Sequence, residues 1–382
     1  MQHTSHIELS RSALKTNISF IKNMLGETTF SSVVKGNAYG HGISHFCPLL
    51  YENGIRHFSV FSANEAFDVL NTLPKDISIM IMGHIDNDQL EWAIKNEIEF
   101  YVFEEDRLNK AIETARKLNI PARIHLEMET GMNRSGFSIR KLKYLLGILE
   151  ENKTNLQLMG ICSHLAGAES ITNYKRIKDQ YERFTKVQKR LREVEWLNTK
   201  YHLACSAASI QYPKTRMDLA RIGILQYGFF PSNEVLVQYL TKNKTHENPL
   251  KRVISWKTTV MDVKEVKAGE FVGYGTSFFT SAKSKIALIP VGYSHGFSRS
   301  LSNQGKVLIR GQRFDVIGTV NMNMMAVDIT QADSIAKGEE VVLIGKQGDL
   351  DISVSSFSDY SNLLNYELLT RLPAYITRKI TP

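Results

Sequence analysis

The first 230 residues of this 382-residue chain repeat one pattern, in which a short β-rich run is followed by a polar or amphipathic segment. The eight runs are SSVVK (31–35), HFSVF (57–61), SIMIMG (78–83), EFYVF (99–103), ARIHLEM (122–128), LQLMGICSH (156–164), YHLACS (201–206) and ARIGILQYG (220–228). Strands that alternate with helices are expected to pair in parallel through right-handed crossovers. Eight such strands close a TIM-type (β/α)8 barrel. The alternative is a doubly wound open sheet. In that fold a GxGxxG motif usually follows the first strand, and this sequence has none there.

The character of the sequence changes after about residue 250. Closely spaced β-rich segments with Gly-centred turns follow, such as SKIALIPVGY (284–293) and KVLIRGQRFDVIGTV (306–320). These segments predict a mainly β domain, and the polar stretch TKNKTHENP (241–249) is the predicted linker. We therefore expect an α/β chain with a (β/α)8 barrel over residues 1–240 and a C-terminal β-domain over residues 241–382.

Charge and composition limit the partners that the chain can have. The net charge is +8, but basic and acidic residues are interleaved, as in KVQKRLREVEW (186–196), which is typical of a solvated helix face rather than of a nucleic-acid site. Three cysteines without close spacing predict neither disulfides nor a metal site and fit a reducing compartment. No apolar run approaches the roughly eighteen residues of a membrane helix, and the N-terminus lacks the apolar core of a secretory signal. We expect a cytoplasmic protein without a membrane or nucleic-acid partner.

Reactive side chains fall at the predicted carboxyl ends of the barrel strands, where this fold builds its active sites. Lys35 ends the first strand within VVKGNAYGHG (33–42). A strand-end lysine ordinarily extends its ammonium group to water, whereas a desolvated lysine loses its proton more easily and can form a Schiff base. The same rim is predicted to carry Tyr39, Arg134, His164, Ser206, Arg221 and Gly223.

The loops after the seventh and eighth strands are the usual phosphate site of this fold. Ser206 offers a hydroxyl there, and Gly223 lets backbone N–H groups approach an anion. Ser206 by itself would be an ordinary strand-end hydroxyl. A lysine that faces a phosphate site across the barrel mouth, however, favours pyridoxal 5′-phosphate (PLP), whose aldehyde would condense with Lys35.

Seven motifs follow one another along nearly the whole chain. In order they are VVKGNAYGHG, ETGMNRSGF, SHLAGAE, CSAAS, RIGILQYG, GYGTSF and NYELLTRLPAY. Together they resemble the bacterial alanine racemase family, whose members are fold-type III PLP enzymes with an N-terminal barrel and a C-terminal β-domain. The resemblance implies an enzyme that interconverts L- and D-alanine and supplies D-alanine for peptidoglycan.

The resemblance also implies roles for individual residues. Lys35 would carry PLP and act as one catalytic base, and Tyr274 would be the second base, supplied by the partner subunit of a homodimer with shared active sites. The implied cofactor contacts are Lys35, Tyr39, His164, Ser206, Arg221, Gly223, Ile224 and Tyr366. The implied substrate contacts are Arg134, Met322 and Asn323.

Two bases on opposite faces of the substrate explain why these residue types are needed. One removes the α-proton and the other returns a proton, so the substrate need not turn over. A free tyrosine, with a pKa of ~10, is a poor base at neutral pH, and positive charge from His164 or Arg221 would favour the phenolate of Tyr274. Arg221 cannot donate its proton outright to the pyridine nitrogen of PLP. The ring then stays a weaker electron sink, which should suppress transamination.

Three positions depart from the family pattern. Glu127 stands where the family often has a carbamylated lysine, and its carboxylate could serve Arg134 in the same way. His295, in GYSHG, occupies an acidic position, and we expect a solvated loop histidine there. Asn323 replaces an aspartate, which leaves open whether serine is a second substrate or the main one.

Two other functions stay open at this point. A fold-type III PLP amino-acid decarboxylase would use a similar barrel and lysine, but typically has a cysteine-bearing motif in its β-domain, and no cysteine follows Cys205. A non-catalytic PLP-binding protein is usually a lone barrel, so the predicted β-domain and Tyr274 argue against it.

Overall fold

The computed structural model describes residues 4–192, 199–354 and 365–382. Contacts divide the chain into two units. The barrel unit comprises Ala13–Lys35 and Cys47–Lys251, and the β unit comprises Met1–Ser12, Gly36–Phe46 and Arg252–Pro382. The chain therefore leaves the barrel unit directly after Lys35. This division is not sequential, unlike the two predicted domains, because two N-terminal segments group with the C-terminal residues.

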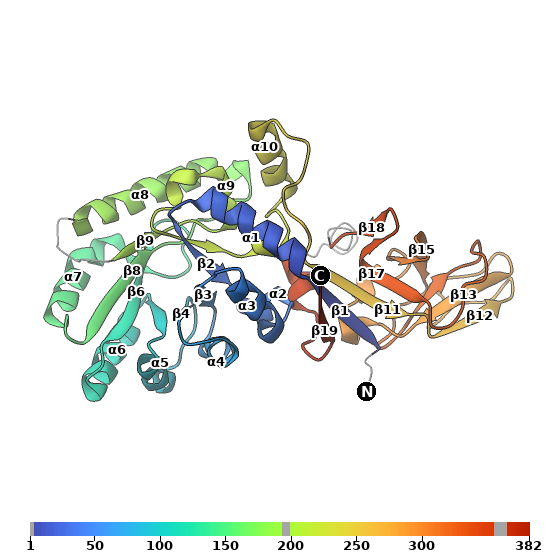
Figure 1. The fold of residues 1–382 in the computed structure, drawn as a ribbon, viewed down its shortest axis with the longest axis horizontal. Helices are drawn as coiled ribbons and strands as arrows, with labels where there is room; N and C mark the ends of the chain where they lie inside the picture. The colour runs from blue at the N-terminus through green and yellow to red at the C-terminus, as the bar shows by residue number, and fades with distance from the viewer. Residues whose placement is uncertain (1–3, 193–198, 355–364) are drawn as a thin grey trace. The chain divides into compact units, whose positions relative to one another are not determined.

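The barrel unit is built on a parallel sheet whose strands follow the order β10-β2-β3-β4-β5-β6-β8-β9 (Figure 1). They are β2 (Thr29–Val33), β3 (His57–Val60), β4 (Ser78–Ile81), β5 (Glu99–Val102), β6 (Ala122–Glu129), β8 (Leu156–Cys162), β9 (Lys200–His202) and β10 (Leu219–Ile222), and the short β7 (Phe137–Ser138) pairs with β6. A parallel bridge between Cys205 and Arg221 joins the ends of β9 and β10, so the barrel is nearly closed. All eight predicted strands form, which confirms the predicted fold class.

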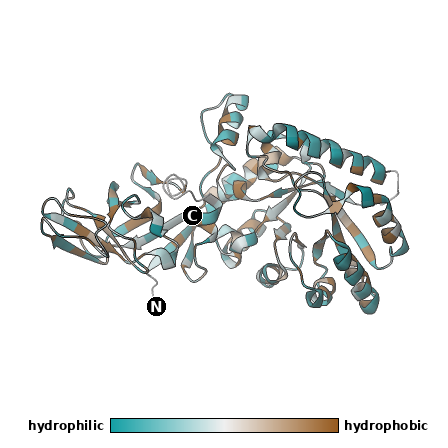
Figure 2. Cartoon of the chain, turned by 180° about the vertical axis from the view of Figure 1, so that it is seen from behind, coloured by the Kyte–Doolittle hydropathy of each residue, from teal (hydrophilic) through white to brown (hydrophobic). Residues whose placement is uncertain are grey.

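Helices cover the outside of these strands. They are α1 (Arg11–Leu25), α3 (Ile43–Glu52), α4 (Ala63–Thr72), α5 (Leu90–Lys95), α6 (Glu105–Leu118), α7 (Leu142–Glu151), α8 (Tyr174–Arg192), α9 (Ser206–Gln211) and α10 (Asn233–Asn243). Figure 2 shows hydrophobic segments along the strands, whereas the outward helix faces are mostly hydrophilic. Strands such as β3 and β5 are buried on both faces, as expected for parallel strands covered by helices.

Helix α6 illustrates how the local sequence determines these elements. The Glu104 carboxylate accepts a hydrogen bond from the Arg107 backbone N–H over 2.8 Å and caps the first turn. The buried residues Leu108, Ala111, Ile112 and Ala115 recur at helical spacing. The helix ends at Asn119, which adopts the left-handed conformation with φ 53°.

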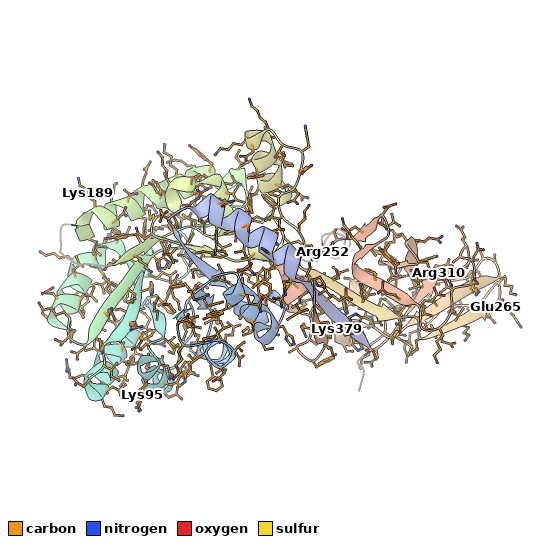
Figure 3. All side chains as sticks on the ribbon, viewed as in Figure 1. Lys95, Lys189, Arg252, Glu265, Arg310 and Lys379 are labelled. Atoms are coloured by element: carbon orange, nitrogen blue, oxygen red, sulfur yellow. The ribbon has the colours of Figure 1, made fainter. Side chains whose placement is uncertain are left out.

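One predicted segment ends outside the described residues, and another has a different extent from that expected. Helix α8 was predicted to reach residue 196, but residues 193–198 lie outside the described part of the chain. Its basic residues lie on the outside, as Lys189 shows in Figure 3. The predicted linker at 241–249 begins with three helical residues, because α10 continues until Lys244 adopts a left-handed conformation with φ 51°. None of the described helices has the length and hydrophobicity that a membrane span requires.

The β unit contains a sheet with the order β12-β13-β16-β15-β14-β17-β11-β1-β19, and β18 pairs with β17. Its strands are β1 (Ser5–Ser10), β11 (Ile254–Thr259), β12 (Asp262–Val266), β13 (Ser284–Ile289), β14 (Lys306–Ile309), β15 (Gln312–Ile317), β16 (Met325–Asp328), β17 (Glu340–Gln347), β18 (Leu350–Ile352) and β19 (Thr377–Thr381). The first strand of the chain lies inside this sheet, because Ile7 is opposite Trp256 on β11 and Arg378 on β19. The indole N–H of the buried Trp256 donates to the Ser5 hydroxyl over 3.2 Å.

Candidate active site

Lys35 lies at the carboxyl end of β2, the position predicted from the sequence. The carbonyl of Val33 accepts two hydrogen bonds of 2.9 Å, one from the Gln226 amide and one from the Tyr227 hydroxyl. Both donors belong to η5 (Ile224–Tyr227), the turn that follows β10. The strand that presents the lysine and the predicted phosphate loop are therefore held together within the barrel unit.

The surroundings of Lys35 favour its neutral amine. The side chain is exposed to solvent, yet the surrounding protein partly desolvates its amine. The resulting desolvation lowers its pKa, and the guanidinium groups of Arg134 and Arg221 lower the pKa further. A lysine with a lowered pKa is a better nucleophile at neutral pH than an ordinary surface lysine.

The segment after Lys35, labelled α2 (Lys35–Tyr39), is a left-handed turn rather than a right-handed helix. Gly36, Asn37, Ala38 and Tyr39 have φ values of 62°, 52°, 53° and 50°. Each non-glycine residue costs roughly 1–2 kcal/mol in this conformation. The Asn37 side-chain carbonyl offsets part of this by accepting the Ile43 N–H over 2.9 Å. The glycines of VVKGNAYGHG predicted a turn, but not three consecutive left-handed non-glycine residues.

Gly40 and Arg378 hold the end of this turn within the β unit. A Cβ atom on Gly40 would lie 1.8 Å from the Leu369 carbonyl oxygen, so no side chain fits there. The Arg378 guanidinium donates to the Gly40 carbonyl over 2.7 Å. Leu369 belongs to α12 (Asn365–Thr370), so the turn is packed against the C-terminal helix of the β unit.

The structure brings Tyr39 and Tyr366, two of the predicted phosphate contacts, together in the β unit. Their ring centroids are 6.0 Å apart. Tyr39 is buried and Tyr366, in α12, is half-buried. The left-handed turn and α12 therefore place two phenol groups side by side, although they are more than 300 residues apart in the sequence.

Ser206, Gly223 and Ile224 form a second cluster, in the barrel unit. Ser206 is the buried first residue of α9, and its hydroxyl accepts the Gly223 N–H over 2.9 Å. Gly223 directly precedes η5, which begins at Ile224. The predicted phosphate contacts of the barrel are therefore next to one another. Hydroxyl and backbone N–H groups of this kind are suitable donors for a phosphate group.

Arg221 is buried, and its guanidinium has four protein acceptors. It donates to His202 Nδ1 over 2.6 Å and to the carbonyls of Ser163, Leu203 and His202 over 2.8, 3.1 and 3.1 Å. The sequence reasoning did not select His202. The available signal was a histidine inside the predicted buried strand YHLACS.

His164 lies two residues beyond the end of β8 and is uncharged at neutral pH. Desolvation, followed by the positive charges of Arg221, Arg134 and Lys35, lowers its pKa to about 3. Of the two expected sources of positive charge for a tyrosine phenolate, His164 and Arg221, this lowered pKa favours Arg221. Burial next to the guanidinium groups of Arg221 and Arg134 makes a positive charge on His164 unfavourable.

Glu127 is buried near the end of β6, close to two of the predicted site arginines. Burial raises its pKa, while a hydrogen bond with Ser135 and the charges of Arg221 and Arg134 act in the opposite direction. The loop that carries Arg134 is held by Glu129, whose carboxylate accepts the backbone N–H of Asn133 over 2.8 Å and that of Arg134 over 3.3 Å. This arrangement is compatible with Glu127 acting on Arg134.

Tyr274 lies on an exposed turn of the β unit between β12 and β13. Its side chain is 75% exposed. Gly273 and Gly275 on either side have φ values of 78° and 72°, which favour glycine. The Thr319 hydroxyl donates to the Tyr274 carbonyl over 3.3 Å and so anchors the turn.

Met322 and Asn323 are held by Ser294, a residue of the GYSHG motif. The Met322 carbonyl accepts the Ser294 N–H over 3.0 Å and the Ser294 hydroxyl over 2.8 Å. The Asn323 amide donates to the same hydroxyl over 3.0 Å. The amide of Asn323 thus stabilises the contact between two loops, and its carbonyl can accept a further hydrogen bond.

His295 is buried, so the expectation of a solvated loop histidine is wrong. Its Nδ1 lies 3.3 Å from the Gly292 N–H and its Nε2 lies 3.4 Å from the Thr4 hydroxyl. Burial lowers its pKa. The physical reason is packing, because Thr4 and Tyr375, both distant in the sequence, lie next to its ring.

Comparisons with known proteins identify this combination of a barrel, a strand-end lysine and a β unit. The family described as alanine racemase, N-terminal domain, matches residues 9–231, and the alanine racemase C-terminal domain matches residues 253–380. The chain is therefore an enzyme of the isomerase class.

Individual relatives agree over the full length. The alanine racemase of Leptospira interrogans serogroup Icterohaemorrhagiae serovar copenhageni is 32% identical over 381 residues, which cover 98% of this chain and 95% of that protein. The alanine racemase structure from Clostridium difficile 630 has a TM-score of 0.90 at 26% identity and covers 100% of this chain and 96% of that one. The Bartonella henselae alanine racemase, described with covalently bound pyridoxal phosphate, has a TM-score of 0.85 at 27% identity and covers 99% and 100%. The chain belongs to the alanine racemase family, which confirms the resemblance.

Proposed function

We propose that this chain binds PLP at Lys35 and interconverts L- and D-alanine, with Lys35 and Tyr274 as the two bases. D-Alanine made in this way would supply peptidoglycan synthesis. The observation that carries the proposal is the position of Lys35. The pKa of its amine is lowered. Lys35 follows a strand whose last carbonyl accepts hydrogen bonds from the turn that begins at Ile224.

The side chains present fit this cofactor. Ser206 and the N–H groups of Gly223 and Ile224 are suitable donors for a phosphate group. Tyr39 and Tyr366 would add phenol donors from the β unit. The Arg221 guanidinium, held by its four acceptors, would present a fixed positive charge to the pyridine nitrogen and would keep its own protons.

When bound, PLP supplies an electron sink for the charge left after removal of the α-proton. Lys35 Nζ would accept or return the proton on one face, and the Tyr274 hydroxyl would do so on the other. Since the pKa of His164 is lowered, the guanidinium of Arg221 would supply the positive charge that favours the phenolate of Tyr274. Arg134 and the backbone of Met322 would hold the substrate carboxylate.

We infer that Tyr274 acts in the active site of a partner subunit. Its 75% exposure on a glycine-flanked turn supports this, because a base that meets its substrate across a subunit boundary must project from the surface of its own chain. The homodimer with shared active sites thus stays part of the proposal.

Serine is the second substrate that we propose. The carbonyl of the Asn323 amide can accept a hydroxyl, and a pocket that admits a hydroxymethyl group also admits a methyl group. Serine as the main substrate, decarboxylation, and PLP binding without catalysis are the alternative functions.

Incubation with single L-amino acids followed by chiral chromatography tests the proposal. We expect D-alanine at the highest rate and D-serine at a lower one. Serine turnover above alanine would favour a serine racemase, and carbon dioxide release would favour a decarboxylase. Bound PLP with no turnover of any amino acid would contradict the proposed catalysis.

A further inference from the structure

Four buried side chains form a continuous hydrogen-bonded chain inside the barrel. Arg221 on β10 donates to His202 Nδ1 over 2.6 Å. His202 Nε2, on β9, lies 2.9 Å from His125 Nδ1 on β6. His125 Nε2 lies 2.8 Å from Glu99 Oε2 on β5. Each of the four residues is at most 5% exposed.

A second branch ends on the same carboxylate oxygen. His57 Nε2 on β3 lies 3.4 Å from Glu99 Oε2, and His57 Nδ1 lies 2.8 Å from the Ser31 hydroxyl on β2. Ser31 in turn shares a hydrogen bond with the Ser59 hydroxyl. Glu99 is thus the point at which two polar chains of the barrel interior meet.

The donor and acceptor in each hydrogen bond of this chain can be assigned by starting at Arg221. A guanidinium has donors only, so His202 Nδ1 must accept and carries no proton. A neutral His202 then has its proton on Nε2 and donates to His125 Nδ1. His125 has its proton on Nε2 and donates to the Glu99 carboxylate.

The charges agree with this assignment. Burial lowers the pKa of both His125 and His202, which keeps them neutral. Burial also opposes the charge of Glu99, but hydrogen bonds from His125 and His57 outweigh it and lower the pKa of Glu99. The chain therefore links a permanent cation to a permanent anion through two neutral imidazoles.

We propose that Glu99 is a positioning residue for Arg221, because its carboxylate fixes the tautomers of His125 and His202 and thereby the orientation of the Arg221 guanidinium. The relevance of this to catalysis rests on the proposed function, in which Arg221 faces the pyridine nitrogen of PLP. Buried polar networks of this kind are stable only when every member has its partner.

Glutamine in place of Glu99 tests the idea with little change of shape. Its amide is uncharged and can turn its N–H₂ group toward His125. Its carbonyl could also accept from His125 and keep the present tautomers, but the orientation with N–H₂ toward His125 requires the reverse tautomer of both histidines. An N–H of His202 would then point at the Arg221 guanidinium, where two donors cannot bond. The matched control is Glu97→Gln, which removes the same charge from an exposed residue that pairs with Arg123 near the start of β5.

The primary measurement is the nitrogen-15 NMR spectrum of the histidine side chains in the protein as purified. In the unsubstituted protein we expect His125 and His202 to be neutral with protonated Nε2 from pH 6 to 8. Protonated Nδ1 on His202 would overturn the proposal, even if the variant does not fold. In Glu99→Gln we expect a second tautomer of His202, and in Glu97→Gln we expect none.

Kinetics and absorbance give the second measurement. In Glu99→Gln we expect kcat to fall about tenfold, as for other partners that orient a functional side chain, with KM within about twofold, because Glu99 does not touch the substrate. We also expect a changed visible absorbance maximum of the bound PLP. An unchanged His202 tautomer, kcat and absorbance would overturn the proposal. The tautomers are read without turnover, so they test the network even if the racemase activity itself is absent.

Discussion

The carbonyl oxygen of Val33 accepts a hydrogen bond from the hydroxyl of Tyr227 over 2.9 Å. Val33 ends the strand that presents Lys35, and Tyr227 ends the turn that begins at Ile224. This bond, together with that from Gln226, ties the proposed phosphate loop to the strand of the reactive lysine. It therefore sets the spacing between the two ends of the proposed cofactor site.

The substitution Tyr227→Phe removes this bond and keeps the ring. Because Tyr227 is completely buried, we expect the free energy of unfolding to fall by about 1 kcal/mol, and PLP to bind several-fold more weakly. Urea unfolding and PLP titration measure the two effects. The exposed Tyr144 supplies the control Tyr144→Phe, which should change neither. Equal effects of the two substitutions would mean that the bond to Val33 does not matter.

Lys35 should be the residue that carries PLP. We expect Lys35→Ala to lose the visible absorbance of the covalently bound cofactor and almost all racemase activity, because Lys35 follows a barrel strand whose last carbonyl is bonded to the proposed phosphate loop. Borohydride reduction followed by peptide mapping identifies the modified lysine in the unsubstituted protein. Labelling of a different lysine would disprove the assignment.

Mixtures of two inactive variants should regain activity if Tyr274 acts in a partner subunit. After subunit exchange between Lys35→Ala and Tyr274→Phe chains, each mixed dimer has one site with both bases. Random exchange of equal amounts would restore about a quarter of the original activity, because half of the dimers are mixed and half of their sites are intact. Absence of recovery after demonstrated exchange would argue that each site is built from one chain.

Glu127 should make stability depend on pH in a definite direction. Its pKa in the folded protein is raised above the ordinary value of 4.5 by burial, so the folded state binds the proton more tightly than the unfolded state. The resulting stabilisation is complete below pH 4.5 and is lost as the pH rises through the raised pKa. Relative to Glu127→Gln, the unsubstituted protein should therefore become less stable over this range.

Urea unfolding from pH 4.5 to 8 measures this difference. The exposed Glu113 provides the control Glu113→Gln, for which we expect a nearly constant difference over the same range. A difference for Glu127→Gln that grows in the opposite direction would show that the nearby arginines, rather than burial, dominate the carboxyl group.

Asn323 should broaden the substrate range. A hydrogen bond from a serine hydroxyl to its amide would contribute about 0.5–1.5 kcal/mol, or roughly a threefold to tenfold change in relative specificity. We expect Asn323→Asp to change the ratio of kcat/KM for L-serine over L-alanine by that factor. The prediction fails if serine is not turned over, or if the ratio is the same in both proteins.

The sequence by itself determined the barrel. Parallel strands that are buried on both faces must be short continuous apolar runs, and helices that cover them must be amphipathic, so the pattern is visible without coordinates. The same logic selected Lys35, His164 and Ser206 as candidates, because each is the last residue of one of these runs. The motif resemblance added Tyr274 and Tyr366, for which no local pattern exists.

Only the tertiary structure decided how distant segments meet. Strand β1 pairs with β19 at the other end of the chain, and the turn after Lys35 is left-handed because Leu369 and Arg378 pack against it. His295 is buried because Thr4 and Tyr375 lie next to its ring. The chain from Arg221 to Glu99 crosses four strands, whose inward side chains become neighbours only when the barrel closes. Such contacts depend on the position of the partner and not on local spacing, so the sequence pattern can mark a buried histidine but cannot identify its partner.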